Sequence, residues 1–172
     1  YTTLFRSHLM LRERFSLSDL TDDVVLVARN LLPSDMISMN RARVHGIVMD
    51  AGGKTSHTAI LARAFEIPAV LGLGGAARGI KSGERLIVDG NTGDVRVEPD
   101  SDTQDTYELA RQRSRQRDDS LAAIAGLPAR TPDGHDVVIK ANIEVPEEVD
   151  SVLRHGAVGV GLFRSEFLFL QP

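Results

Sequence analysis

The chain has 172 residues, of which 42% are hydrophobic and 26% charged, and its formal net charge is −4. These proportions are ordinary for a soluble globular protein, and the acidic balance argues against the basic surface that nucleic-acid binding requires. The absence of cysteine excludes disulfides and thiolate metal sites, and no apolar run approaches the length of a membrane span or a signal-peptide core. We therefore expect a cytoplasmic protein that binds neither nucleic acid nor a membrane.

The chain opens with residues 1–16, which fit no secondary-structure pattern and remain unassigned. From residue 17 to residue 99 the sequence predicts one compact α/β domain. Residues 24–28 form a continuous apolar run, which is typical of a buried strand. Pro33 then begins a short helix that extends to about Asn40, because proline is favoured in the first turn.

The most informative stretch lies between residues 50 and 63. An apolar run at 44–49 precedes it and predicts a strand. Apolar residues at three-to-four spacing follow it and predict an amphipathic helix. Gly52 and Gly53 lie between the two elements, in a context where backbone N–H groups can converge on an anion.

The helix after this loop is predicted to begin with Thr55 or Ser56 as its N-cap. His57 then falls in the first turn, where the positive end of the helix dipole disfavours the imidazolium form and leaves a nitrogen lone pair. The same field stabilises an anion on the ring, such as a phosphoryl group. These are the properties that a phosphate-carrying histidine needs. On spacing alone, a helix-capping turn with an incidental histidine fits equally well.

The rest of this domain is predicted as short strands joined by glycine-rich turns. Residues 67–71 form a strand that starts at Pro68 or lies at a sheet edge. A glycine-rich segment at 72–83 encloses a short helix. Strands at 86–88 and 95–97 follow, with strong turn residues between them.

A long helix is predicted at residues 100–125. Its middle is polar on every face, as in helices that connect domains. The arginines at 111–117 are followed by two aspartates and have no aromatic residues among them, which argues against a nucleic-acid site.

A second unit is predicted after Pro128. It begins with a strand at 137–141, continues with a helix that ends at His155 and Gly156, and reaches another strand at 158–163. Strand–helix–strand at this spacing is a βαβ unit, so its two strands should be parallel.

Arg164 follows the second of these strands, at its carboxyl end. Its guanidinium suits a phosphate or a carboxylate. Pairing with Glu166 at the strand end is the alternative.

The run GGKTSHTAILARAFEIPAVLG, at residues 52–72, resembles the phosphohistidine signature of the PEP-utilising enzymes. That family includes phosphoenolpyruvate-protein phosphotransferase (Enzyme I of the sugar phosphotransferase system), pyruvate phosphate dikinase and phosphoenolpyruvate synthase. The resemblance implies a swivelling α/β domain with a mixed sheet, on which His57 is phosphorylated. The residues expected to support the phosphoryl group are Gly52, Gly53, Lys54, Thr55, Ser56 and Thr58.

Two later motifs, ANIE at 141–144 and GLFRSEFLF at 161–169, resemble the start of the phosphoenolpyruvate-binding barrel of Enzyme I. The second motif favours Enzyme I over the dikinases and implies that Arg164 binds phosphoenolpyruvate. We therefore expect a fragment: a phosphohistidine domain at 17–99, a linker helix at 100–128, and the first βαβ unit of an incomplete (β/α)8 barrel at 129–172. Two strands cannot close a core, so the last part should be poorly stable alone.

By this resemblance, phosphoenolpyruvate phosphorylates His57, which passes the group to the carrier protein HPr. The complete enzyme would use Mg²⁺, with ligands outside this chain. Full-length relatives form homodimers through the barrel, so the fragment should be monomeric.

Three positions depart from the family pattern. Leu32 and Met36 stand where relatives often have threonine, and Met36 cannot supply a hydroxyl near the histidine. Lys54 stands where arginine is commoner, which keeps the charge but loses the bidentate fork. Reduced transfer efficiency is a consequence to expect.

Three alternatives stay open. A dikinase or synthase domain would use the same chemistry with a nucleotide as second partner. A non-catalytic regulatory module would bind an anion at the same glycine turn. Ser56 as a hydrolytic nucleophile with His57 as its base is the weakest, because neighbouring side chains at a helix start point about 100° apart.

Overall fold

The computed structural model describes residues 2–9 and 17–165 of the chain. It divides into two compact units, residues 1–111 (unit 1) and residues 112–172 (unit 2). Helices and strands alternate in both units, so the predicted α/β class is confirmed. Among the described residues, none of the helices combines the length and the apolar composition that crossing a membrane requires.

Unit 1 is built on a six-stranded mixed sheet with the order β4-β3-β2-β1-β5-β6. Strands β1 to β4 are parallel to one another, whereas β5 is antiparallel to β1 and forms a hairpin with β6. The strands are β1 (Thr2–Leu9), β2 (Val24–Ala28), β3 (Val44–Met49), β4 (Ala69–Leu71), β5 (Arg85–Asp89) and β6 (Asp94–Val97). The mixed sheet and the edge position of the strand after Pro68 agree with the sequence prediction.

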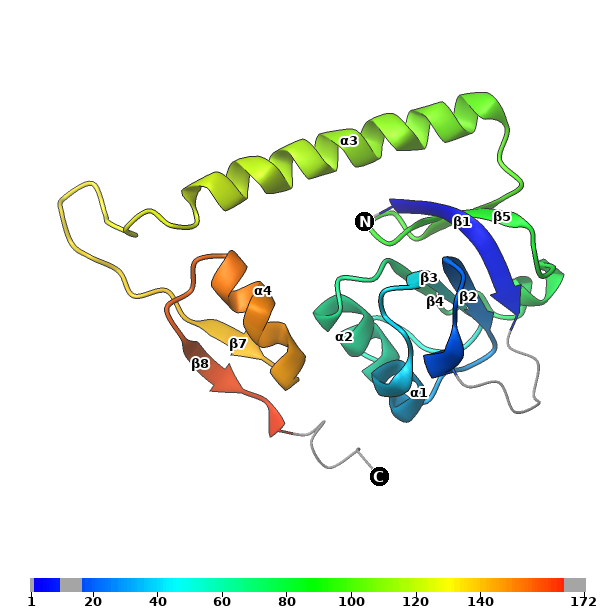
Figure 1. Cartoon of the computed structure of the whole chain (residues 1–172), viewed down its shortest axis with the longest axis horizontal. Coiled ribbons are helices and arrows are strands. Elements are labelled where there is room, and N and C mark those ends of the chain that lie inside the picture. The colour runs from blue at the N-terminus through cyan, green and yellow to red at the C-terminus, as the bar shows by residue number, and fades with distance from the viewer. Residues whose placement is uncertain (1, 10–16, 166–172) are drawn as a thin grey trace. The chain divides into compact units, whose positions relative to one another are not determined.

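Strand β1 is the element that the sequence did not predict. Figure 1 shows it in dark blue as the long strand between β2 and β5. It pairs with β2 on one side and with β5 on the other, so both edges of its backbone find partners. Sequence pattern failed here because strand preference depends strongly on what a segment pairs with. Residues 10–16, also unassigned from the sequence, lie outside the described residues.

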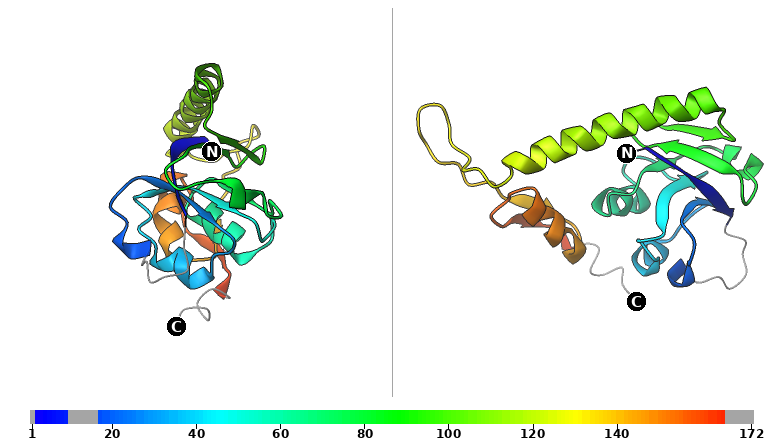
Figure 2. Two further views of the ribbon diagram at one scale, coloured as in Figure 1. Left: turned by 90° about the vertical axis from the view of Figure 1, so that its right-hand side faces the viewer. Right: turned by 45° about the horizontal axis from the view of Figure 1, so that its top comes forward.

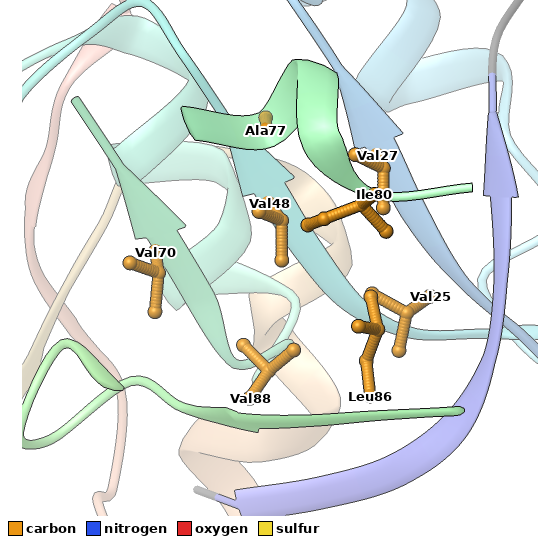
Figure 3. Close-up of a cluster of buried hydrophobic side chains, with 8 residues drawn as sticks. All are labelled: Val25, Val27, Val48, Val70, Ala77, Ile80, Leu86 and Val88. Atoms are coloured by element: carbon orange, nitrogen blue, oxygen red, sulfur yellow. The ribbon is translucent and has the colours of Figure 1, made fainter. Parts of the chain in front are cut away.

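The core of unit 1 follows from the alternation of side chains along its strands. Val25, Val27 and Val48 point to one face of the sheet, where they form a cluster with residues of other elements (Figure 3). The remaining members of this cluster are Val70, Ala77, Ile80, Leu86 and Val88. The short 3₁₀ helix η2 (Ala76–Gly79) supplies Ala77 and leads into Ile80, and so covers this face.

The residues that alternate with these valines along β2 and β3 face the other side of the sheet, and they are buried as well. Leu26 and Ile47 are both 0% exposed, as are Met36 of helix α1 (Pro33–Ser38) and Leu61 of helix α2 (His57–Ala64). Helix α1 connects β2 to β3, and α2 connects β3 to β4. Because these strands are parallel, each connection returns along the sheet through a helix. A further 3₁₀ turn, η1 (Leu17–Asp19), precedes β2.

Helix α3 (Ser101–Ile124) confirms the predicted polar helix, and it runs as one continuous helix in every view (Figure 2). No residue of α3, all of which is described, is buried. Its start is capped by Asp100, whose Oδ1 accepts a bond of 2.8 Å from the Thr103 amide. Hydrogen bonds from the Thr103 side chain and backbone lower the pKa of Asp100.

Unit 2 contains the predicted βαβ unit in shortened form. Strands β7 (Ala141–Ile143) and β8 (Val160–Phe163) are parallel, and η3 (Pro146–Glu148) with α4 (Val149–Arg154) connects them. Gly156 ends the connection with a φ of 78°, as expected for a left-handed cap.

The strand predicted at 137–141 is wrong in its position. Residues 137–140 belong to no strand, and β7 begins only at Ala141, where pairing with Val160 starts. Val138 is 67% exposed, so this apolar run is not buried. A strand forms where a partner is available, and the run itself carries no such information.

Candidate functional site

Three loops meet at the carboxyl ends of the parallel strands β2, β3 and β4. The loop at 50–56 follows β3, and its Ala51 amide donates to the carbonyl of Arg29, in the loop after β2, at 3.0 Å. The Leu73 amide, in the loop after β4, donates to the Met49 carbonyl at 3.1 Å. This edge of an open parallel sheet is where ligands are commonly bound.

His57 is the first residue of α2 and is exposed at this edge. Ser56 is the N-cap, so the structure selects it over Thr55. The Ser56 Oγ accepts a bond of 3.2 Å from the Ala59 amide, and the Ser56 carbonyl accepts one of 3.1 Å from the Ile60 amide. The amides before Ala59 are those that a helix start leaves without an intrahelical partner. The histidine therefore lies where backbone N–H groups and the helix dipole favour an anion.

The glycine turn before His57 depends on Gly52. Its φ is 95°, a left-handed conformation that favours glycine, and a Cβ there would lie 3.3 Å from the Ser56 Oγ. The Ser56 amide closes the turn by donating to the Gly53 carbonyl at 3.0 Å. A side chain at Gly53 would meet nothing within 4 Å, so the turn is open on that side.

Thr58 has a structural hydrogen bond. Its side chain is buried, and its Oγ1 donates to the Leu31 carbonyl at 3.2 Å. Among the predicted supporting groups, Thr58 therefore offers its backbone amide rather than its hydroxyl. The same bond fastens the residue after His57 to the loop that follows β2.

Of the three positions that depart from the family pattern, Leu32 and Met36 differ in exposure. Leu32 is 57% exposed and occupies the N-cap of α1, where it makes no side-chain capping bond. Met36 is 0% exposed and belongs to the core. Leu32 adjoins Leu31, the residue bonded to Thr58, whereas the Met36 side chain is withdrawn from the surface.

Lys54 is exposed and lines a cavity of about 550 Å³. Gly53, Arg63 of α2 and Glu66 just beyond that helix also line it, together with β4 and the turn at 90–93. His57 is not among the lining residues, so the cavity reaches the glycine turn at Gly53 and Lys54 but is not lined by the histidine.

Sequence reasoning missed the role of Asp50, which directly follows β3. Its side chain is only 8% exposed, and its Oδ1 accepts hydrogen bonds from the amides of Gly75 and Ala77. An acidic residue between a buried strand and a glycine pair was the available signal.

Arg164 lies directly after β8, and its Nη1 is 2.7 Å from Oε1 of Glu144, which directly follows β7. The pair joins the carboxyl ends of two parallel strands. Glu144 thus takes the role that the alternative prediction gave to Glu166, and Glu166 itself lies outside the described residues. Within the described ranges, no three His, Cys, Asp or Glu residues gather in a way that could hold a metal ion.

Two family descriptions match the chain. Residues 20–93 match the mobile domain of PEP-utilising enzymes, and residues 118–172 match their PEP-binding domain. A phosphoenolpyruvate-protein phosphotransferase of Bacillus subtilis (strain 168) is 41% identical over 153 residues, which cover 89% of this chain and 27% of that protein. The chain belongs to the PEP-utilising enzymes.

Other members of the PEP-utilising family agree with this assignment. A phosphoenolpyruvate-protein phosphotransferase of Haemophilus influenzae is 38% identical, over 90% of this chain and 27% of that protein. A solution NMR structure of an Enzyme I protein is 46% identical with a TM-score of 0.54, over 59% of this chain and 41% of that one. The chain thus spans about a quarter of the length of the curated relatives. His57 falls within the mobile-domain match and Arg164 within the PEP-binding match.

Proposed function

We propose that this chain is part of a phosphoenolpyruvate-protein phosphotransferase, in which His57 carries a phosphoryl group from phosphoenolpyruvate to the carrier protein HPr. The observation that supports it best is the position of His57. The residue begins α2 directly after a glycine turn, at the carboxyl edge of three parallel strands. The names of the relatives supply the donor and the protein acceptor.

In the proposed reaction a ring nitrogen of His57 attacks the phosphorus of phosphoenolpyruvate. A nitrogen–phosphorus bond forms while the bond from phosphorus to the enol oxygen breaks, and the electron pair leaves with pyruvate enolate. A histidine nitrogen of HPr then attacks the same phosphorus and releases His57. Transfer in both directions requires that His57 be accessible, and the side chain is exposed.

The surrounding groups would stabilise the phosphoryl oxygens. The amides of Gly52, Gly53 and Thr58 belong to the turn and to the helix start, and Lys54 and Thr55 are exposed beside them. The Ser56 hydroxyl accepts a bond from Ala59 and retains its own O–H to donate. Donors that are already oriented stabilise transferring charge without reorganising.

Arg164 is the residue that we propose for binding phosphoenolpyruvate in the PEP-binding part. It follows a parallel strand at its carboxyl end, where the fork of an arginine can meet a phosphate or a carboxylate. Glu144 holds one side of that fork at 2.7 Å.

The same proposal covers the rest of the protein. We propose a mobile phosphohistidine domain that ends near residue 99, a helical linker, and a barrel that begins near residue 129. The wider protein would act in the cytoplasm in the sugar phosphotransferase system, with Mg²⁺ bound by residues outside the described ones, and would dimerise through its barrel.

A graft tests this function. Residues 1–172 would replace the matching segment of the Bacillus subtilis relative, and the chimera would be supplied with labelled phosphoenolpyruvate, Mg²⁺ and HPr. We expect label on HPr, and an acid-labile, alkali-stable label on the chimera that is lost in His57→Ala. A folded chimera that stays unlabelled, or that is labelled equally in His57→Ala, would contradict the proposal.

A further inference from the structure

The side chain of Asp50 joins two loops of the site. Its Oδ1 accepts hydrogen bonds from the amides of Gly75, at 2.8 Å, and Ala77, at 3.0 Å. Its Oδ2 lies 3.8 Å from the Nε of Arg78, and its side chain is 8% exposed. Its own carbonyl accepts from the Gly74 amide at 3.2 Å. One residue at the end of β3 therefore holds the loop that follows β4.

The loop that follows β4, residues 72–77, is only weakly constrained by its own residues. Gly72, Gly74 and Gly75 have φ values of 84°, 64° and 110°, so the segment consists largely of left-handed glycines. Glycine loses more conformational freedom on ordering than any other residue. Hydrogen bonds from outside the loop must therefore fix its path, and Asp50 supplies three of them through Oδ1 and its carbonyl.

The loop at 72–77 lies against the glycine turn that precedes His57. A Cβ on Gly72 would come within 3.0 Å of the Gly52 carbonyl oxygen, so the two backbones touch at this point. A Cβ on Gly52 would in turn contact the Leu71 side chain at 3.7 Å. In addition to the bonds to Asp50, the C-terminal end of this loop is anchored by Ala77 and Ile80, which pack into the core cluster (Figure 3).

We propose that Asp50 is a positioning residue for phosphoryl transfer at His57. By fixing residues 72–77 it supports the backbone of the glycine turn at Gly52, and so sets where the amides of that turn point. It touches none of the reacting atoms. The inference rests on the proposed role of His57, and it adds a determinant of that site on a different loop.

The hydrogen bonding of the Asp50 side chain predicts different effects for two substitutions. A single oxygen, Oδ1, accepts both amide bonds. Asp50→Asn retains a carbonyl oxygen of the same shape, whereas Asp50→Ala leaves both amides without an acceptor. The positioning role therefore predicts that asparagine restores what alanine removes, although the carboxylate charge is lost in both variants.

Asp89 offers a matched control within the same unit. It also follows a buried stretch of strand, is 8% exposed, and accepts bonds through Oδ1 from the amides of Asn91, at 2.9 Å, and Thr92, at 3.4 Å. Its bonds stay within the β5–β6 turn and reach neither the 50–56 nor the 72–77 loop. Asp89→Ala thus removes a similar carboxylate without releasing the site loop.

Potassium phosphoramidate is the probe, because this small donor phosphorylates histidine with release of ammonia and needs no partner protein. The wild-type chain, His57→Ala, Asp50→Ala, Asp50→Asn and Asp89→Ala would be phosphorylated, and occupancy at His57 followed by ³¹P NMR and peptide mass spectrometry. We expect Asp50→Ala to slow phosphorylation of His57 by about tenfold to a hundredfold, as small displacements at reacting centres do. Asp50→Asn and Asp89→Ala should remain within about threefold of the wild-type rate, because both keep the geometry of the site.

The outcomes separate the two proposals. No phosphorylation of His57 in the wild-type chain would contradict the proposed function itself. Equal rates in wild type and a folded Asp50→Ala, or equal losses in Asp50→Ala and Asp89→Ala, would overturn the positioning role while leaving the function intact. A loss in Asp50→Asn as large as in Asp50→Ala would also overturn it.

A second pair of variants covers the case that Asp50→Ala does not fold. Gly72→Ala disturbs the contact with Gly52 and leaves Asp50 in place, while Gly93→Ala has the same backbone strain, with a φ of 83° against 84°, and no neighbour within 4 Å. We expect only Gly72→Ala to slow His57 phosphorylation beyond its effect on stability. Equal rates in the two variants would count against the inference.

Discussion

The two compact units differ most in what their strands bury. In unit 1 all five residues of β2 are buried, and Leu26, Ile47 and Leu86 are completely shielded from solvent. In the described part of unit 2, the buried hydrophobic residues are Ile143, Val145 and Val152. All four residues of β8 are exposed, although three of them are apolar.

This difference shows that the strand pattern and the parallel pairing do not by themselves make a core. Parallel strands are normally covered on both faces, as β2 and β3 are by residues from η2 and from the helices. In unit 2 the pairing of β7 and β8 is correct for a βαβ unit, yet Leu162 stays 49% exposed. We therefore expect unit 1 to hold its fold through its own core and unit 2 to be the less stable part.

The largest expected effect contrasts one apolar strand residue from each unit. Ile47→Ala, at a site 0% exposed, should lower the free energy of unfolding of unit 1 by about 2–5 kcal/mol, because it leaves a cavity. Leu162→Ala, at a site 49% exposed, should cost less than about 0.5 kcal/mol. Residue-resolved hydrogen exchange in denaturant measures both, and equal losses would refute the contrast.

The next effect compares two glycines with the same backbone conformation. Gly52 in unit 1 and Gly134 in unit 2 have φ values of 95° and 93°, so alanine should cost each about 1–2 kcal/mol in left-handed strain. At Gly52 the new Cβ also meets the Ser56 Oγ at 3.3 Å, whereas at Gly134 it meets nothing. We expect Gly52→Ala to lower the free energy of unfolding of unit 1 by more than Gly134→Ala lowers that of unit 2, and denaturant unfolding followed by hydrogen exchange in each unit measures both. Equal losses would show that the contact adds nothing.

A smaller effect should stabilise unit 1. Leu32 occupies the N-cap of α1 without a side-chain capping bond and is 57% exposed. Leu32→Thr supplies a hydroxyl that can accept from a first-turn amide, which is worth about 0.5–2 kcal/mol. Chemical denaturation of unit 1 measures the gain, with Leu32→Ala as the control that lacks a hydroxyl. A gain of equal size in both variants would point to loss of the exposed apolar chain rather than to capping.

The smallest effect is the pH dependence from Asp23. The hydrogen bond from Arg43 at 3.1 Å, and then that from His45 at 3.2 Å, lower the pKa of Asp23 below its ordinary 3.8. Its stabilising contribution is therefore fully present above that ordinary value and is lost as pH falls through the folded-state pKa. The difference in unfolding free energy between wild type and Asp23→Asn should shrink on acidification below 3.8. A difference that stays constant through that range would contradict the assignment.

By itself the sequence determined the elements that carry the candidate site. The apolar runs at 24–28 and 44–49 are strands because continuous β-branched segments need burial on both faces. The glycine pair and the polar residues after it place a helix start at His57, since those residue types suit a turn and a cap. The motif around His57 also identified the family, because the residues that carry the resemblance are contiguous in the chain.

Only the tertiary structure decided what depends on contacts between distant residues. Residues 2–9 became a strand because β2 and β5 pair with its two edges, and residues 137–140 did not because pairing with β8 starts at Ala141. Arg164 bonded Glu144, twenty residues earlier, because parallel strands bring their carboxyl ends together. Asp50 reached Gly75 and Ala77 for the same reason. Local pattern records the preference of a segment, whereas its partners follow from how the whole chain folds.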